Sequence, residues 1–210
     1  MNKDDFKHQP LNGYSLKICV ADDEVDMRDF FEKILPALGH QVLAVAENGR
    51  QLVDHCRELK PDMVITDIKM PDMDGIEAAQ AICSERPTPI ILISAHHDAA
   101  LIRRAEADHV LAYLVKPVGR ADLEPAIALA ARRFAEFQAL RQETSDLRQA
   151  LADRRHIEQA KGLLMRAAGL SEKDAFRRLQ ELASEKNQKL IEAAHAVLAL
   201  ERALRPAEKS

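Results

Sequence analysis

Carboxylates stand where short apolar runs end, and this is a pattern that can support chemistry. Asp67 closes one apolar run, and Asp22, Asp23 and Glu24 follow another at residues 16–21. Three successive carboxylates repel one another, and a divalent cation relieves that repulsion. A carboxylate held at the end of a strand is also placed to act as a nucleophile. The pattern predicts a cation site beside a nucleophilic aspartate, or else an acidic loop whose carboxylates are solvated and cap the next helix.

Two further polar side chains follow apolar runs later in the chain. Ser94 follows residues 90–93, and Lys116 follows residues 110–115 directly before Pro117. A metal-binding acidic cluster, a carboxylate nucleophile, a hydroxyl and an ammonium together suit an aspartyl phosphate. The sequence contains no glycine-rich phosphate loop, which argues against a nucleotide site. We therefore expect the phosphate to arrive as a transferred group.

The apolar runs alternate with helical faces along the first 130 residues. Short connections between parallel strands require crossover helices, and the carboxyl ends of such strands meet at one edge of the sheet. The alternation predicts an α/β fold with an open, doubly wound, flavodoxin-like five-stranded parallel sheet. Strands are expected at residues 16–21, 41–46, 63–66, 89–94 and 110–115, and helices at residues 25–38, 50–59, 75–83, 99–107 and from residue 122 onward.

Composition restricts the class of protein. The chain has 210 residues, of which 47% are hydrophobic, and its amino-terminal residues lack the apolar core of a signal peptide. It contains no apolar stretch long enough to span a membrane, so we expect a cytoplasmic protein. Cys19, Cys56 and Cys83 are far apart and form no CxxC pair, which favours three free thiols over a disulfide framework or a zinc site. His96 and His97 fit a solvated loop better than a metal site.

The strand-end residues, in this order, resemble the receiver domain of two-component response regulators over about residues 15–130. That resemblance implies that Asp67 accepts a phosphoryl group from a sensor histidine kinase. It also implies that Asp22, Asp23 and Asp67 bind Mg²⁺ together with the backbone carbonyl of Lys69. The residues that carry the resemblance are Asp22, Asp23, Asp67, residues 70–75, Ser94, Tyr113, Lys116 and Pro117.

The resemblance assigns switch roles to three more side chains. Lys116 would pair with the phosphate, Ser94 would hydrogen-bond to it, and Tyr113 would turn inward to fill the space that Ser94 leaves. Haloacid dehalogenase-like phosphatases also form an aspartyl phosphate, but they resemble one another in an Asp two residues after the nucleophile. This chain has Lys69 there, which disfavours the phosphatase reading.

A long uninterrupted helix is predicted after the fifth strand. Residues 126–161 contain neither Gly nor Pro, and Leu140, Thr144, Leu147 and Leu151 recur at spacings of four, three and four. This spacing predicts a short coiled-coil seam continuous with the last receiver helix, and thus a homodimer whose formation could depend on phosphorylation. The alternative is one face of an amphipathic helix that packs within the same chain.

A small helical module is predicted to follow. Gly169 and Leu170 break the long helix, and Ser171 begins the next one. A three-helix module of this size does not readily hold a catalytic cleft, so we expect a binding module and no enzyme. The expected buried faces are Ala175, Phe176, Leu179, Leu182 and Ala183 in one helix, and Leu190, Ile191, Ala194, Val197 and Leu198 in the last.

Charge differs between the two halves of the chain. Residues 1–131 carry a net charge of −8 and residues 132–210 a net charge of +4. Basic side chains in the module could neutralise nucleic-acid phosphates, although residues 156–210 carry a net charge of only +2, which also fits a solvated face. The candidate RNA contacts are Lys161, Arg166, Arg177, Arg178, Lys186 and Lys189.

The module resembles the ANTAR domain, an RNA-binding output module of transcription antitermination regulators, over about residues 150–203. The resemblance implies that a dimer of modules binds paired RNA stem-loops in a nascent transcript, where unpaired loop bases can be read on their edges. The residues that carry it are 157–165, Gly169, Leu170, Ser171, Ala175, Phe176, Leu179 and 189–194.

Together these features predict a phosphorylation-controlled antiterminator. The alternative function is a phosphorylation-controlled protein-interaction adaptor without nucleic-acid binding. A DNA-binding regulator is disfavoured because the last helix lacks an arginine cluster for the major groove. The expected parts are a polar extension (1–14), the receiver domain (15–131), a coiled-coil linker (132–155), the ANTAR module (156–203) and a tail (204–210).

Overall fold

The computed structural model describes residues 15–95 and 110–204, which divide into two compact units with the boundary between residues 138 and 139. The helix expected at residues 99–107 lies outside the described residues, as do His96 and His97.

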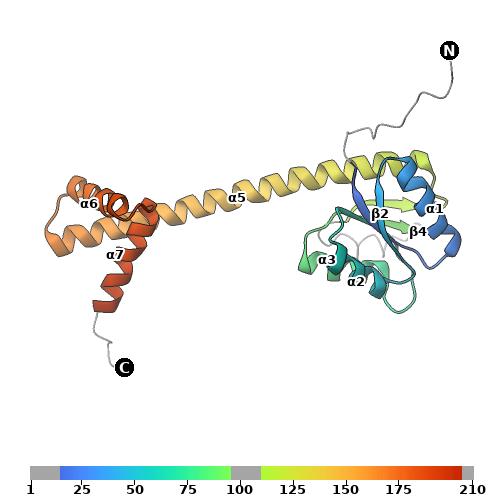
Figure 1. Ribbon diagram of the computed structural model, residues 1–210, viewed down its shortest axis with the longest axis horizontal. Helices are drawn as coiled ribbons and strands as arrows, with labels where there is room; N and C mark the ends of the chain where they lie inside the picture. Colours follow the sequence, from blue (N-terminus) through green and yellow to red (C-terminus); the bar gives the residue numbers. More distant parts are fainter. Residues whose placement is uncertain (1–14, 96–109, 205–210) are drawn as a thin grey trace, which may run out of the picture. The chain divides into compact units, whose positions relative to one another are not determined.

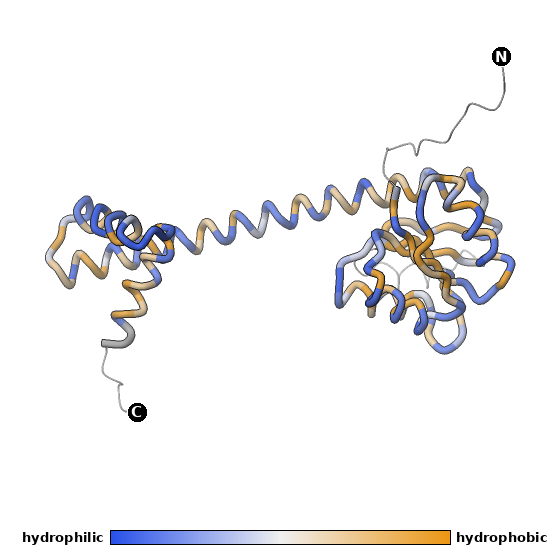
Figure 2. Tube along the Cα trace, viewed as in Figure 1, coloured by the Kyte–Doolittle hydropathy of each residue, from blue (hydrophilic) through white to orange (hydrophobic). Residues whose placement is uncertain are grey.

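The first unit contains a five-stranded sheet in which all strands run parallel (Figure 1). Their order across the sheet is β2-β1-β3-β4-β5, which confirms the predicted doubly wound, flavodoxin-like architecture. Figure 2 shows that the strands are largely hydrophobic, as expected for a parallel sheet buried on both faces. The strands are β1 (Lys17–Ala21), β2 (Gln41–Ala46), β3 (Met63–Asp67), β4 (Ile90–Ser94) and β5 (Val110–Val115).

Helices cover both faces of the sheet because successive strand residues point to opposite sides. Ile18 of β1 packs with Phe31 of α1 and Leu123 of α5, whereas Cys19 packs with Leu52 of α2 and Ile76 of α3. All three cysteines are free thiols in the structure, and Cys19 and Cys56 are buried. The helices are α1 (Val25–Ala37), α2 (Gly49–Leu59), α3 (Gly75–Glu85) and the beginning of α5 (Arg120–Ala168).

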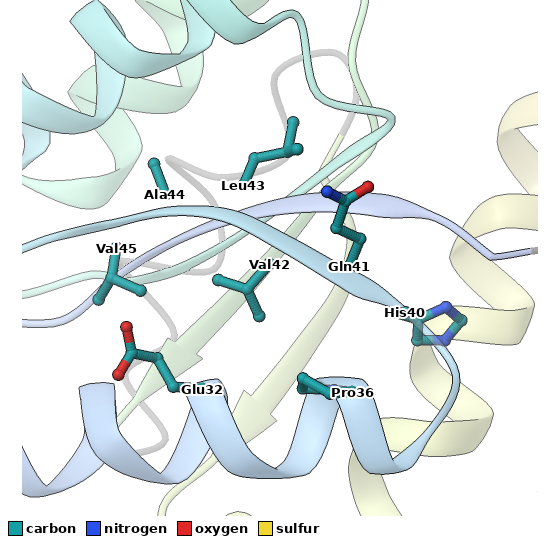
Figure 3. A pocket seen from close by; sticks show the side chains of 8 residues that line it. All are labelled: Glu32, Pro36, His40, Gln41, Val42, Leu43, Ala44 and Val45. Atoms are coloured by element: carbon teal, nitrogen blue, oxygen red, sulfur yellow. The ribbon is translucent and has the colours of Figure 1, made fainter.

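The strand β2 is an edge strand, and a hollow of about 610 Å³ lies between it and α1 (Figure 3). Glu32, Pro36 and His40 line one side of this hollow, and residues 41–45 line the other. It lies on the flank of the sheet, and its lining does not include the acidic residues that follow β1 and β3.

The helix α5 runs without interruption from residue 120 to residue 168, and so belongs to both units. Leu123 and Ile127, near its start, are buried in the first unit. Farther along, Leu140, Leu147 and Leu151 are 60–63% exposed. The predicted continuity of this helix is therefore confirmed, and its leucine stripe is accessible in the single chain.

The second unit packs the end of α5 against α6 (Glu172–Glu185) and α7 (Leu190–Leu204). Its core contains Ala160, Leu179 and Ala194, one from each helix. Gly169 has a φ of +65°, the left-handed conformation with which helices commonly end. The hydroxyl of Ser171 then accepts a hydrogen bond from the backbone N–H of Asp174 and so caps α6.

The predicted burial of Phe176 is wrong. Ala175, Leu179 and Ala183 occupy the inward face of α6 at spacings of four, whereas Phe176 lies about 100° around the helix and is 36% exposed. In the part of the chain that the structure describes, no helix combines the length and apolar character needed to cross a membrane.

Candidate functional site

Four carboxylates gather where β1 and β3 end. Asp22 is fully buried and Asp67 is 6% exposed, whereas Asp23 and Glu24 are exposed. One oxygen from each of the four lies within 4.8 Å of the others. The adjacency of β1 and β3 in the sheet produces this cluster, because each strand ends directly before or at its aspartate.

Capping does not explain these carboxylates. Asp74, rather than Asp67, caps α3 by accepting hydrogen bonds from the backbone N–H groups of Ile76 and Glu77. Glu24 stands at the N-cap of α1, but its side chain makes no capping hydrogen bond. The simpler interpretation of the acidic residues as helix caps therefore does not describe this site.

Lys116 brings a positive charge into the cluster from the end of β5. Its Nζ donates hydrogen bonds to Oδ2 of Asp67 at 2.9 Å and to Oε1 of Glu24 at 2.8 Å, and it lies 3.0 Å from Oδ2 of Asp22. Burial alone would lower the pKa of Lys116, but its hydrogen bonds to the three carboxylates outweigh burial and raise that pKa. The ammonium is thus held in its charged form beside Asp67.

One oxygen of the buried Asp22 carboxylate has no hydrogen-bond donor. Burial raises the pKa of Asp22, although the hydrogen bond from Lys116 opposes the rise. Its Oδ1 accepts hydrogen bonds from the backbone N–H of Glu24 and from Nζ of Lys116. Its buried Oδ2 accepts no hydrogen bond, although the Lys116 ammonium lies 3.0 Å away. Mg²⁺ prefers carboxylate and carbonyl oxygens as ligands. The carboxylate cluster, including the Asp22 oxygen that accepts no hydrogen bond, therefore fits such an ion.

The other predicted site residues are Ser94, Tyr113 and Lys69. Ser94 ends β4 and is 2% exposed, and its carbonyl accepts a hydrogen bond from the backbone N–H of Lys116. Tyr113, on β5, is half-buried and packs against the α2–α3 side of the sheet. Lys69 lies two residues beyond Asp67 with an exposed side chain.

Three supporting residues were not singled out for this role from the sequence. Glu24 pairs with Lys116, and Arg28 donates to the backbone carbonyls of Asp22 and Asp23, each at 2.8 Å. Gly75 is required by close packing, since a Cβ there would lie 1.9 Å from the carbonyl oxygen of Asp67. The signals available in the sequence were Arg28, a basic residue about one helical turn after the acidic run, and Gly75, which follows the Asp67 loop.

Two family models match the chain: the response regulator receiver domain matches residues 18–128, and the ANTAR domain matches residues 145–198. The chain is a receiver–ANTAR response regulator. The transcriptional regulatory protein PdtaR of Mycobacterium tuberculosis is 38% identical to it over 182 residues, covering 87% of this chain and 89% of the relative. These similarities support a phosphorylation-controlled response regulator.

Other similarities are confined to part of the chain. A protein-glutamate methylesterase/protein-glutamine glutaminase of Carboxydothermus hydrogenoformans is 40% identical over 114 residues, which cover 52% of this chain and 32% of that protein. The signal receiver domain of a modulated diguanylate cyclase from Desulfovibrio desulfuricans has a TM-score of 0.55 at 28% identity, covering 58% of this chain and 98% of that one. The CheX-CheY-BeF3-Mg²⁺ complex from Borrelia burgdorferi gives a TM-score of 0.51 at 26% identity, covering 55% and 89%.

The candidate RNA contacts of the ANTAR domain differ in accessibility. The Lys161 side chain is only 9% exposed, and its Nζ lies 2.9 Å from Glu158 and 2.8 Å from Glu172. These hydrogen bonds raise the pKa of Lys161, that to Glu172 most strongly. The other candidates are exposed: Arg177 and Arg178 pair with acidic residues of α6, and Arg166, Lys186 and Lys189 lie near the ends of helices.

Proposed function

We propose that this response regulator is switched by phosphorylation of Asp67 and that its active form binds paired RNA stem-loops as a transcription antiterminator. The observation that carries the proposal is the nearly buried Asp67 carboxylate, held 2.9 Å from the Lys116 ammonium in a chain that also has an ANTAR domain. The phosphodonor is a sensor histidine kinase, and we place the protein in the cytoplasm. The proposed parts are those predicted above: receiver domain 15–131, linker 132–155 and RNA-binding module 156–203.

In the phosphotransfer step, a carboxylate oxygen of Asp67 attacks the phosphorus of a phosphohistidine. A P–O bond forms, the P–N bond breaks, and the released imidazole nitrogen takes up a proton, which leaves an acyl phosphate on Asp67. Asp22, Asp23, Asp67 and the Lys69 carbonyl would hold Mg²⁺, which would supply charge neutralisation for the transferring group. Lys116 would exchange its hydrogen bond to the carboxylate for one to a phosphoryl oxygen.

Ser94 and Tyr113 transmit the change in charge. Ser94 ends β4 one position past Ile93, the residue that pairs with Asp67, so it lies next to the strand that carries the phosphoacceptor. We propose that Ser94 moves to donate to that group and that Tyr113 turns into the vacated space. This would alter the surface of the sheet near β5 and the start of α5.

The helix α5 would carry this signal because it continues from the receiver domain into the ANTAR domain. Leu140, Leu147 and Leu151 form an exposed stripe at coiled-coil spacing, to which we assign the homodimer contact with a second copy. A dimer presents two ANTAR domains to two linked stem-loops, so the second binding event occurs at a high effective concentration.

The exposed basic residues of the module are the proposed phosphate contacts, namely Arg166, Arg177, Arg178, Lys186 and Lys189. Lys161 is a different case, because direct RNA contact would require its ammonium to leave two carboxylates. Exposed apolar side chains favour the second candidate function, a protein-interaction adaptor. Met165 is 37% exposed, Phe176 36% and Leu200 63%, and the module could present them to a protein partner.

One experiment separates these functions. The full chain is treated with a small-molecule phosphodonor and Mg²⁺, and mass spectrometry then checks for one acid-stable, hydroxylamine-labile phosphoryl group that Asp67→Asn lacks. Binding of a labelled two-hairpin RNA and of duplex DNA of equal length is then measured over a salt series. RNA-selective binding by the phosphorylated protein supports the antiterminator, whereas phosphorylation without RNA binding supports the adaptor. Failure to phosphorylate at Asp67 would contradict both.

A further inference from the structure

Two histidines meet between α5 and α7 in the ANTAR domain. Nε2 of His195 lies 3.2 Å from Nδ1 of His156, and the rings stand nearly edge to face with their centroids 4.8 Å apart. His195 is exposed and His156 is half-buried. The pair is therefore open to solvent on one side, and neither the phosphorylation site nor the proposed RNA contacts include it.

The hydrophobic core fixes this separation. Ala194, directly before His195, is fully buried against Ala160 of α5, and Ile157, directly after His156, packs on the same cluster. Small alanine side chains let the two helix backbones approach closely. The packing beneath the two rings therefore holds the helix backbones at a separation that lets the rings meet.

The distance suits a shared metal ion as well as a hydrogen bond. Zn²⁺ binds imidazole nitrogen at about 2.0–2.1 Å, which in a tetrahedral site places two ligand nitrogens about 3.3 Å apart. We propose that His156 and His195 form a two-histidine site for a borderline transition-metal ion, Zn²⁺, Ni²⁺ or Cu²⁺, that ties α7 to α5. Water would fill the remaining coordination positions on the exposed side.

The proton balance of this site is simple. In the observed contact, one of the two facing nitrogens carries the hydrogen and donates it to the other. For a metal ion to bind, that ring changes to its other tautomer through exchange with water, so that its hydrogen lies on the nitrogen pointing away. Both rings stay neutral, and no net proton is released.

The ligand type separates this site from the acidic cluster of the receiver domain. Imidazole nitrogen selects Zn²⁺, Cu²⁺ and Ni²⁺, whereas carboxylate and carbonyl oxygens suit Mg²⁺. A metal ion that binds the folded module and not the unfolded chain stabilises it by mass action. The proposal does not depend on RNA binding or on phosphorylation.

Equilibrium dialysis of the full, untagged chain against Zn²⁺ tests the proposal, with Mg²⁺ in large excess to saturate the acidic cluster. We expect His156→Gln, His195→Gln and the double variant each to bind one equivalent of Zn²⁺ less than the unchanged chain. His55→Gln, on α2 of the receiver domain, serves as the matched control and should lose none. Circular dichroism confirms that the variants retain their helices.

A second readout follows Cu²⁺ by electron paramagnetic resonance. A shared site gives coupling to two imidazole nitrogens that disappears in either single variant. Retention of all bound Zn²⁺ by both single variants would overturn the proposal. It would also be overturned if the losses in the single variants simply added in the double variant, because two independent surface histidines behave in that way.

Discussion

The ammonium of Lys116 lies 2.9 Å from Oδ2 of Asp67 and 3.0 Å from Oδ2 of Asp22, so one side chain directly after β5 pairs with the carboxylates at the ends of both β3 and β1. Each partner is at least 87% buried, and Asp22 is completely so. Removing the cation leaves two nearly buried carboxylates without their countercharge, which is far less favourable than losing a surface ion pair.

We therefore expect Lys116→Met to lower the free energy of unfolding of the receiver domain by about 3 kcal/mol in the absence of divalent ions. Mg²⁺ should restore part of this loss, because it supplies the missing positive charge. Urea unfolding with and without Mg²⁺ measures both effects. Lys69→Met is the matched control, since its exposed side chain should change stability by only about 0.5 kcal/mol or less. Equal stability of the two variants would contradict this account of the cluster.

Gly75 is expected to be intolerant of a side chain. An added Cβ would lie 1.9 Å from the carbonyl oxygen of Asp67, so the backbone beside the phosphoacceptor would have to shift. We expect Gly75→Ala to cost about 1–3 kcal/mol of stability and to slow phosphorylation of Asp67. At Gly119 the nearest atom would be 3.6 Å away, an ordinary contact. Gly119→Ala should therefore phosphorylate at the normal rate, and a Gly75→Ala protein that did the same would refute the expectation.

His40 should give the receiver domain a pH-dependent loss of stability. Burial lowers the pKa of His40, with Glu124 opposing the effect, and its Nδ1 accepts a hydrogen bond from the backbone N–H of Leu16. The unfolded chain therefore binds more protons, and stability falls as pH drops below about 6.5, by at most about 1.4 kcal/mol per pH unit from this group.

Unfolding free energies measured across this pH range should fall less steeply for His40→Gln than for the unchanged chain. His55→Gln provides a control histidine elsewhere in the same domain, on α2. An unchanged slope in His40→Gln would show that the buried ring does not titrate as inferred.

The leucine stripe of α5 should govern dimerisation. Leu147 is 60% exposed, and burying it against a second copy would stabilise the coiled coil. We expect Leu147→Gln to abolish the dimer formed with beryllofluoride and Mg²⁺, whereas Arg148→Gln, one position around the helix, should leave it intact. Sedimentation equilibrium provides the masses. A Leu147→Gln protein that still dimerises on activation would place the contact elsewhere.

Lys161 should act through structure rather than by touching RNA. Its ammonium joins Glu158 on α5 to Glu172 at the start of α6 and lies 6.0 Å from the centre of the Phe176 ring. Lys161→Met should therefore lower the melting temperature of the ANTAR domain, while the exposed Lys173→Met should not. Weaker RNA binding by Lys161→Met with unchanged melting would instead identify a direct contact.

The strand-end chemistry could be read from the sequence because each residue follows an apolar run whose direction a parallel sheet fixes. Asp22, Asp67, Ser94 and Lys116 reach the same edge of the sheet without any further information. The continuity of α5 was predictable for a similar local reason, the absence of Gly and Pro.

Contacts made across the tertiary structure could not be read in this way. Lys161 looked like a free cation because its partner Glu172 belongs to another helix. Phe176 looked buried because two adjacent apolar residues, Ala175 and Phe176, give an ambiguous helical face. In the folded module the smaller of the two, Ala175, faces the core. The meeting of His156 and His195, 39 residues apart, likewise depends on how the module folds.

The most direct test of the switch compares RNA affinity in the two states of the receiver domain. Anisotropy titrations of a labelled two-hairpin RNA would be run on the unchanged chain and on Asp67→Asn, each with and without beryllofluoride and Mg²⁺. We predict that activation tightens RNA binding by about tenfold or more in the unchanged chain, the usual range for coupling between two sites, and leaves Asp67→Asn unaffected. Equal RNA affinity in both states of the unchanged chain would contradict phosphorylation control of RNA binding.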